Sequence, residues 1–76
     1  MPQNSLQLST ATRIKEIRLK KKISQEMLSN ETGIDRTFIS HIENGGRNIS
    51  LETLERLMKG LNVSVEYFFK SELFRK

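Results

Sequence analysis

The fold is decided by residues 24–44, SQEMLSNETGIDRTFISHIEN, in which a glycine separates two short amphipathic segments. Ser24 precedes the first segment and Asp35 precedes the second, and both side chains can accept a hydrogen bond from a free backbone N–H at a helix start. Gly33 readily adopts the left-handed conformation that ends many helices. The stretch therefore predicts helices over residues 25–32 and 36–44, joined by a three-residue turn.

Apolar side chains can fill the angle between these two helices. Ile39 and Ile42 are three residues apart, so they share one face of the second helix. Two short helices joined so tightly cannot run antiparallel; they cross steeply, in the arrangement called helix-turn-helix. We expect the buried side chains between them to be Met27, Leu28, Ile34, Ile39 and Ile42, with Thr32 at the edge.

The opposite face of the second helix is polar and contains no acidic residue. An α-helix fits the major groove of DNA, which is about 12 Å wide. Arginine can donate two hydrogen bonds to guanine, hydroxyls bond base edges or phosphates, and threonine methyl and phenyl groups suit a thymine methyl. The face therefore predicts binding to double-stranded DNA. Its residues are Arg36, Thr37, Ser40, His41 and Asn44, with Phe38 at the border.

Each candidate residue also has a structural interpretation, which the sequence leaves open. Gln25, at the start of the first helix, can bind a phosphate or can buttress the second helix. Arg36 could be a solvated side chain, and Phe38 lies 100° from Ile39 around the helix, so it could belong to the core. His41 suits either plain surface or a phosphate contact.

The rest of the chain predicts an all-α domain of five helices. Residues 1–8 lack helical periodicity and are expected to form a flexible arm. Further helices are expected at 10–21, 51–60 and 65–70, the last with a continuation through Leu73 left open. Ser50 and Ser64 are the expected N-caps of the later two. The expected buried residues are Ile14, Ile17 and Leu19 in the helix at 10–21, and Leu51, Leu54, Leu57 and Met58 in the helix at 51–60.

The composition fits one small cytoplasmic domain. The chain has 76 residues, a formal net charge of +4 and no cysteine. A basic excess favours a polyanionic partner such as nucleic acid, although a basic run such as Arg18, Lys20, Lys21 and Lys22 is also typical of a solvated face. The sequence predicts no membrane span and no signal peptide.

A catalytic or metal-binding role is not indicated. The chain contains one histidine and no glycine-rich phosphate loop, and its acidic residues do not pair with histidine at metal-ligand spacing. A nuclease would need a carboxylate cluster for Mg²⁺, and Glu52 with Glu55 on a helix surface is a poor candidate. We therefore expect no enzyme activity, no metal and no cofactor.

The combined pattern resembles the phage-repressor (Cro/C1, XRE) type of helix-turn-helix family over about residues 11–69. The apolar positions, the turn glycine, the ending Ile42-Glu43-Asn44-Gly45 and the following Ser50-Leu51-Glu52-Thr53-Leu54 fall in one register. This resemblance implies a compact five-helix, lambda-repressor-like domain over residues 9–76, with the helix-turn-helix at about 24–44.

Within that family, DRTFIS at 35–40 followed by GGRN at 45–48 resembles the controller proteins of bacterial restriction–modification systems. The resemblance implies a transcriptional regulator that binds near-palindromic operators and autoregulates its operon as an activator and a repressor. Roles at bases or adjacent phosphates are implied for Arg36, Thr37, Phe38 and Ser40. Contacts with the DNA backbone are implied for Gln25, Asn44, Arg47 and Asn48, although Asn48 could equally be a turn former.

The resemblance also implies a homodimer made by the last two helices. The stretch from Leu51 to Phe74 carries more apolar side chains than a small core consumes. Phe68 is assigned to the core, whereas Val65, Phe69 and Leu73 are spaced by four and form the expected interface stripe. Such a dimer would place two reading helices about 34 Å apart, one turn of DNA.

Some alternatives stay open. A prophage-type repressor shares most of the pattern, and an antitoxin or protein-binding adaptor would use the same fold. Activation would require contact with RNA polymerase, and the candidate acidic residues are Glu26, Glu31, Glu43 and Glu52, among which the sequence does not choose.

Overall fold

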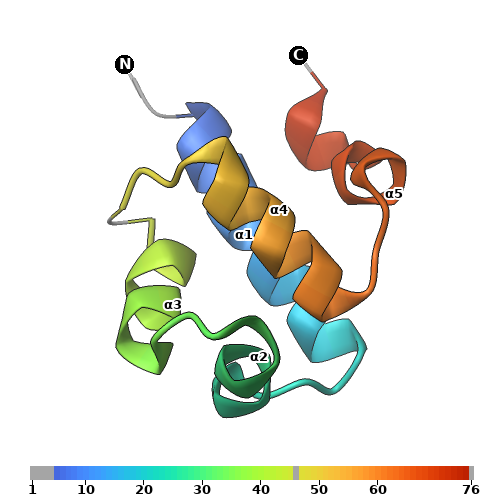
Figure 1. Ribbon diagram of the computed structural model, residues 1–76. Helices are drawn as coiled ribbons and strands as arrows, with labels where there is room; N and C mark the ends of the chain where they lie inside the picture. Colours follow the sequence, from blue (N-terminus) through green and yellow to red (C-terminus); the bar gives the residue numbers. More distant parts are fainter. Residues whose placement is uncertain (1–4, 46, 76) are drawn as a thin grey trace.

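The computed structural model describes residues 5–45 and 47–75, and the regular elements in these ranges are all helical. Helices α1 and α4 lie side by side through the middle of the molecule, with α2 and α3 at one end and α5 at the other (Figure 1). The elements are α1 (Ser5–Lys20), α2 (Gln25–Thr32), α3 (Arg36–Glu43), α4 (Leu51–Leu61), α5 (Val65–Phe69) and the 3₁₀ helix η1 (Glu72–Phe74). The all-α prediction is confirmed.

The four predicted N-caps are all present. The hydroxyl of Ser24 accepts a hydrogen bond from the N–H of Met27, and the carboxylate of Asp35 accepts one from the N–H of Thr37, both at 3.0 Å. Ser50 and Ser64 cap α4 and α5 in the same way. Each cap satisfies a donor that the helix itself leaves free, so the starts of α2–α5 are encoded locally.

The turn between α2 and α3 is held by its own side chains. Gly33 ends α2 with φ +77°, as expected for the left-handed conformation. The N–H of Ile34 donates to the hydroxyl of Thr32 at 3.1 Å, and the hydroxyl of Ser29 donates to the carbonyl of Ile34 at 2.6 Å. These bonds fix the angle at which α3 leaves α2.

One apolar core joins all five α-helices. Leu28, Ile39 and Phe68 are completely buried, so α2, α3 and α5 each contribute a side chain that solvent does not reach. Phe68 therefore belongs to the core of the single chain, as predicted. The buried hydrophobic cluster consists of Ile14, Ile17, Leu28, Ile34, Ile39, Ile42, Leu54, Leu57, Met58, Leu61 and Phe68.

Three residues that the sequence places in the core are exposed. Met27 is 52% exposed and Leu51 is 85% exposed, and Leu19 is exposed as well. Met27 precedes Leu28, and only Leu28 faces α4 and α3, because a helix of eight residues buries a narrow stripe. Leu51 shares the side of α4 that carries Leu54, but it lies in the first turn, where an open groove replaces the core.

Helix α1 begins earlier than the sequence predicts. Residues 1–4 lie outside the described residues, whereas Ser5–Leu8 form the first turns of α1, so the predicted boundary at residue 9 is wrong. Leu6 and Leu8 are both exposed, which explains why no buried periodicity marks this part of the helix. Long-range bonds support it instead: Gln7 donates to the carbonyl of Gly45 at 2.7 Å.

The C-terminal helix is also shorter than the longest prediction. α5 ends at Phe69, and Ser71 caps a separate 3₁₀ helix by accepting a hydrogen bond from the N–H of Leu73. Leu73 therefore does not continue the α5 stripe of Val65 and Phe69. Its carbonyl accepts a hydrogen bond from the hydroxyl of Ser9 at 2.9 Å, so η1 is docked on α1.

A buried ion pair fixes α3 against α1. The guanidinium of Arg18 donates two hydrogen bonds to the carboxylate of Glu43, from Nε at 2.7 Å and from Nη2 at 2.9 Å. The two side chains are only 8% and 2% exposed. The remaining Nη1 group of Arg18 donates to the carbonyl of Ile23 at 2.8 Å. Both charges are therefore paired and hydrogen-bonded, which buried charges require.

We expect Glu43→Gln to destabilise the domain by about 3–5 kcal/mol, because it leaves the charge of Arg18 buried without a counter-ion. The paired variant Arg18→Met/Glu43→Leu should recover most of the loss, since neither residue then carries a buried charge. Thermal unfolding followed by circular dichroism measures both. A Glu43→Gln variant that unfolds with wild-type stability would show that the pair does not hold α3.

Candidate nucleic-acid interface

Helix α3 has one buried side and one exposed side. Ile39 and Ile42 are buried against α1 and α2, as the three-residue spacing predicts. Arg36, Thr37 and His41 point the other way and are exposed. The structure therefore places the predicted polar face on the outside of the molecule, on a helix whose position is fixed by the core, by the Asp35 cap and by the Glu43 ion pair.

The exposed face is not used for internal bonding. Within residues 5–45 and 47–75, the side chains of Arg36, Thr37, His41 and Asn44 make no hydrogen bond or ion pair with the rest of the chain. Ser40 is half-buried at the edge of the face. The donors and acceptors of this face remain available for a ligand, as base or phosphate recognition requires.

Phe38 serves the core and the exposed face together. Its ring is half-buried and packs against the hydrophobic cluster, while the guanidinium of Arg47 lies 5.5 Å from the ring centroid. At this distance a cation is attracted to the face of the ring. The two interpretations of Phe38 left open by the sequence are therefore compatible, and Phe38 also positions a second arginine beside α3.

Gln25 is tied to the other end of α3. Its Nε2 group donates a hydrogen bond to Oε1 of Glu43 at 3.1 Å, the same oxygen that accepts from Arg18. The buttressing role is thus present in the structure. The side chain is only half-buried at the first residue of α2, so it still reaches the surface beside the free N–H groups of that helix.

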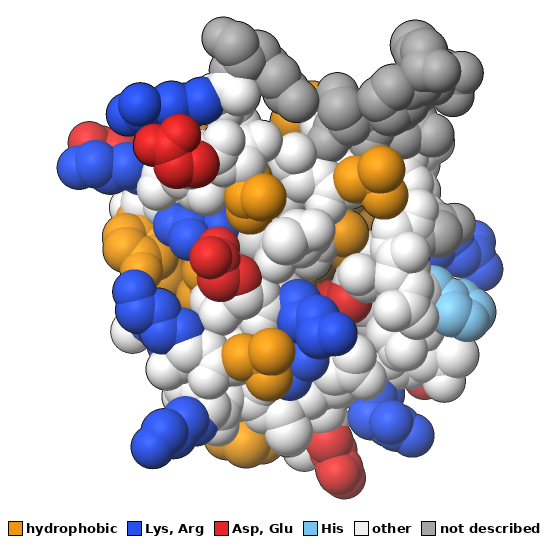
Figure 2. Space-filling view, turned by 180° about the vertical axis from the view of Figure 1, so that it is seen from behind, with side chains coloured by type: hydrophobic (Ala, Val, Ile, Leu, Met, Phe, Trp, Pro, Cys, Tyr) orange, Lys and Arg blue, Asp and Glu red, His pale blue; other side chains and the backbone are white. Residues whose placement is uncertain are grey.

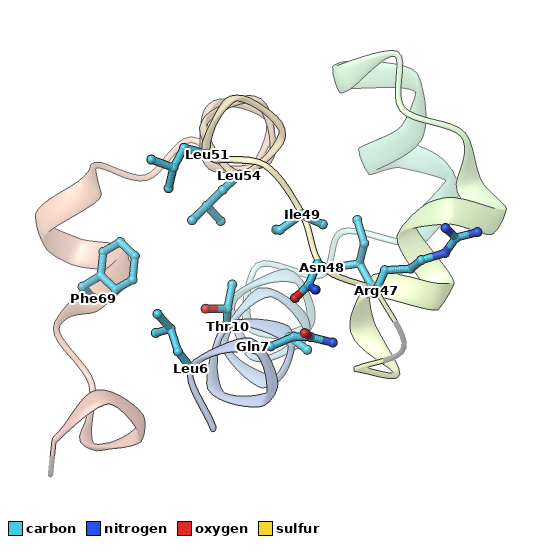
Figure 3. A pocket seen from close by; sticks show the side chains of 11 residues that line it. Leu6, Gln7, Thr10, Arg47, Asn48, Ile49, Leu51, Leu54 and Phe69 are labelled. Atoms are coloured by element: carbon cyan, nitrogen blue, oxygen red, sulfur yellow. The ribbon is translucent and has the colours of Figure 1, made fainter. Parts of the chain in front are cut away.

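The loop after α3 carries two further candidates. Arg47 and Asn48 are both exposed, and Asn48 lies close to Gln7 of α1 at the edge of a groove (Figure 3). Arg47 also lines that groove, and its guanidinium extends toward the ring of Phe38 on α3 (Figure 3). The loop therefore extends the polar surface of α3 toward the start of α4.

Two residues of the basic run at the end of α1 make contacts within the chain. Arg18 forms the buried ion pair with Glu43, and the ammonium of Lys21 donates a hydrogen bond to the carbonyl of Asn62 at 3.2 Å. On the face shown in Figure 2, Lys and Arg side chains are interspersed with acidic and apolar ones. That face therefore carries no broad basic patch.

One acidic candidate for contact with RNA polymerase is excluded. Glu43 is buried in its ion pair with Arg18, so its inclusion among the surface candidates is wrong. Glu26, Glu31 and Glu52 are exposed. The position of Glu43 at the end of the second helix does suggest an internal pairing, but the sequence does not identify its partner, because Arg18 lies 25 residues away.

A second surface is apolar and lies between α1, α4 and α5. A groove of about 310 Å³ opens there, and Leu6, Leu51 and Phe69 point toward it from three different helices (Figure 3). Val65 is 59% exposed and Phe69 is 37% exposed, as an interface stripe requires. Leu73 is half-buried on η1.

The sequence missed Leu6 and Leu51 as part of this surface. The three-residue spacing from Leu51 to Leu54 does place both on one side of α4, but the pattern alone cannot show that residues 5–45 and 47–75 leave Leu51 exposed. Apolar side chains this exposed around a groove are typical of an interaction surface.

Comparison with known proteins agrees with this arrangement. A helix-turn-helix family model matches residues 14–68. Control protein C.BamHI of Bacillus amyloliquefaciens is 43% identical over 61 residues, covering 79% of this chain and 75% of its own length. Control protein C.MunI of a Mycoplasma species is 36% identical over 67 residues, covering 87% of this chain and 90% of its own.

A solved structure of similar shape is the restriction–modification controller protein C.Esp1396I, a tetramer in complex with its natural 35 base-pair operator. It is 45% identical, covers 86% of each chain and superposes with a TM-score of 0.84. The chain belongs to the control-protein family of helix-turn-helix proteins. The resemblance found in the sequence is therefore confirmed, and so is the fold class.

The family match leaves parts of α1 unaccounted for. It begins at residue 14, whereas α1 begins at Ser5, so the first turns of α1 lie outside the matched region. No helix among the described residues is long and apolar enough to cross a membrane. The same part of the chain contains no group of three His, Asp or Glu side chains placed to hold a metal ion.

Proposed function

We propose that this control-family protein is a transcriptional regulator that binds operator DNA through α3 and autoregulates a restriction–modification operon. The observation that carries the proposal is the exposed polar face of α3, fixed by buried contacts on its opposite side. A helix held in place lowers the entropy cost of binding, because its backbone need not be ordered by the DNA. The role is non-catalytic, and it belongs in the cytoplasm of a bacterial cell, where operators lie.

The residues divide by the contacts they can make. Arg36 is the residue best suited to a bidentate contact with guanine, and Thr37 and Ser40 can bond base edges or phosphates. His41, like Ser40, lies farther along α3. Contacts to the DNA backbone, which position the helix without reading sequence, are assigned to Gln25, Asn44, Arg47 and Asn48. Phe38 offers its ring edge to a thymine methyl and supports Arg47.

A second copy of the chain is proposed to cover the apolar groove. Val65, Phe69 and Leu73 were expected to form the interface, and the exposed Leu51 and Leu6 extend it across the groove. Domains of this size bury little apolar surface alone, so a dimer also adds stability. A symmetric pair would present two copies of α3 to half-sites about 34 Å apart.

The relatives favour the controller over the prophage repressor that the sequence left open, since three similar proteins carry control-protein names. An antitoxin or adaptor is not favoured by any observation above. Activation would use an acidic surface beside the DNA, and Glu26, Glu31 and Glu52 are the exposed candidates for contact with RNA polymerase.

We expect Arg36→Ala to weaken binding to the cognate operator by about 1–3 kcal/mol and to relax the preference at one base pair of each half-site. Lys15→Ala, an exposed change on the outer side of α1, is the matched control and should bind as wild type. Competition binding on cognate and singly substituted operators measures both. Equal losses on cognate and scrambled DNA would show that Arg36 touches only phosphate.

We expect Leu51→Asp to convert the dimer into monomers at tens of micromolar and to reduce operator affinity, because it places a charge in the apolar interface. Leu19→Asp changes an equally apolar, exposed residue outside the groove and should remain dimeric. Sedimentation velocity distinguishes the two. A dimeric Leu51→Asp variant with unchanged sedimentation would place the interface elsewhere on the molecule.

A further inference from the structure

The first turns of α1 contact the loop that follows α3, although they are remote from it in sequence. The amide Nε2 of Gln7 donates a hydrogen bond to the carbonyl of Gly45 at 2.7 Å, across 38 residues. Both groups are partly buried. These turns precede residue 14, where the family match begins, so the helix-turn-helix pattern itself does not account for the contact.

Leu8 covers the backbone of the same glycine. A Cβ atom built on Gly45 would lie 2.6 Å from Cδ2 of Leu8, so the leucine occupies the space that a side chain would need. Gly45 also has φ +77°, a conformation that other residues adopt at a cost. Two successive residues of α1 therefore contact Gly45. Gln7 bonds the carbonyl of Gly45, and Leu8 packs on its α-carbon.

That point lies two residues before Arg47. The guanidinium of Arg47 is attracted to the ring of Phe38 on α3, and Asn48 lies beside Gln7 along the groove (Figure 3). The loop is thus supported from two directions, by α1 at Gly45 and by α3 at Arg47. A loop supported in this way loses less conformational entropy when Arg47 and Asn48 bind a phosphate. The smaller entropy loss increases the affinity.

We propose that Gln7 is a positioning residue for DNA binding, which acts through Gly45 to present Arg47 and Asn48 to the phosphate backbone. The inference rests on the proposed function, in which Arg47 makes a backbone contact. Gln7 itself makes no contact with DNA in this scheme. The first turns of α1 are therefore part of the DNA-binding apparatus rather than an appendage of the domain.

The primary test is Gln7→Met, which keeps the length of the side chain and removes the hydrogen bond to Gly45. Operator affinity should fall about threefold to tenfold, the effect of one neutral hydrogen bond. The slope of log K against log salt should become shallower by up to about one unit, as expected when one phosphate contact is lost. Thr12→Ala, an exposed change on the same helix, is the control and should leave both quantities unchanged.

A double-mutant cycle with Arg47→Ala separates positioning from direct contact. If Gln7 acts through the loop, Gln7→Met has little further effect once Arg47 is gone. Additive losses in affinity and salt slope would mean that Gln7 binds DNA independently, and would overturn the proposal. A Gln7→Met protein with wild-type affinity and slope would overturn it as well.

Leu8→Ala provides a second variant if Gln7→Met does not fold, and circular dichroism establishes that each variant is folded before binding is measured. Leu8→Ala removes the contact with Gly45 and should also lose its effect in the Arg47→Ala background.

Failure of the proposed function gives a different result: the wild-type protein would not distinguish operator from scrambled DNA, and Arg47→Ala would change neither affinity nor slope.

Discussion

The carboxylate of Glu43, at the last residue of α3, accepts two hydrogen bonds from Arg18 of α1 and one from Gln25 of α2. A single buried anion thus joins the helix that presents the polar face to the two helices beneath it. A buried ion pair adds little net stability compared with apolar packing, but removing one partner is costly. Its contribution here is geometric, because α3 cannot rotate or slide without separating the paired charges.

This constraint explains why so small a helix can present a defined surface. α3 contains eight residues, too few to be stable alone in water. Ile39 and Ile42 hold its inner side, Asp35 caps its start, and Glu43 fixes its end. The outer side is then free to carry polar residues that no internal contact needs. The apolar groove opens between α1, α4 and α5, and the edge formed by Arg47 and Asn48 adjoins the surface proposed for DNA binding.

Local signals in the sequence predicted the helices, the caps and the two-sided character of α3, because a cap or a three-residue apolar spacing involves neighbours in the chain. Features that depend on distant residues were missed. The pairing of Arg18 with Glu43 spans 25 residues, and the support of Gly45 by Gln7 spans 38. The spacing of Leu51 fits the core, and only the three-dimensional arrangement shows that the described residues leave it exposed. The roles of individual residues at DNA remain predictions.

The central claim is that the outer side of α3 reads a DNA duplex, and selection of bound DNA from a random pool tests it most directly. We expect enrichment of a near-palindromic sequence whose half-sites lie about one helical turn apart, roughly 34 Å. Methylation of guanine N7 in each half-site should block binding, since that atom faces the major groove. Recovery of unselected sequences with no footprint would contradict the account.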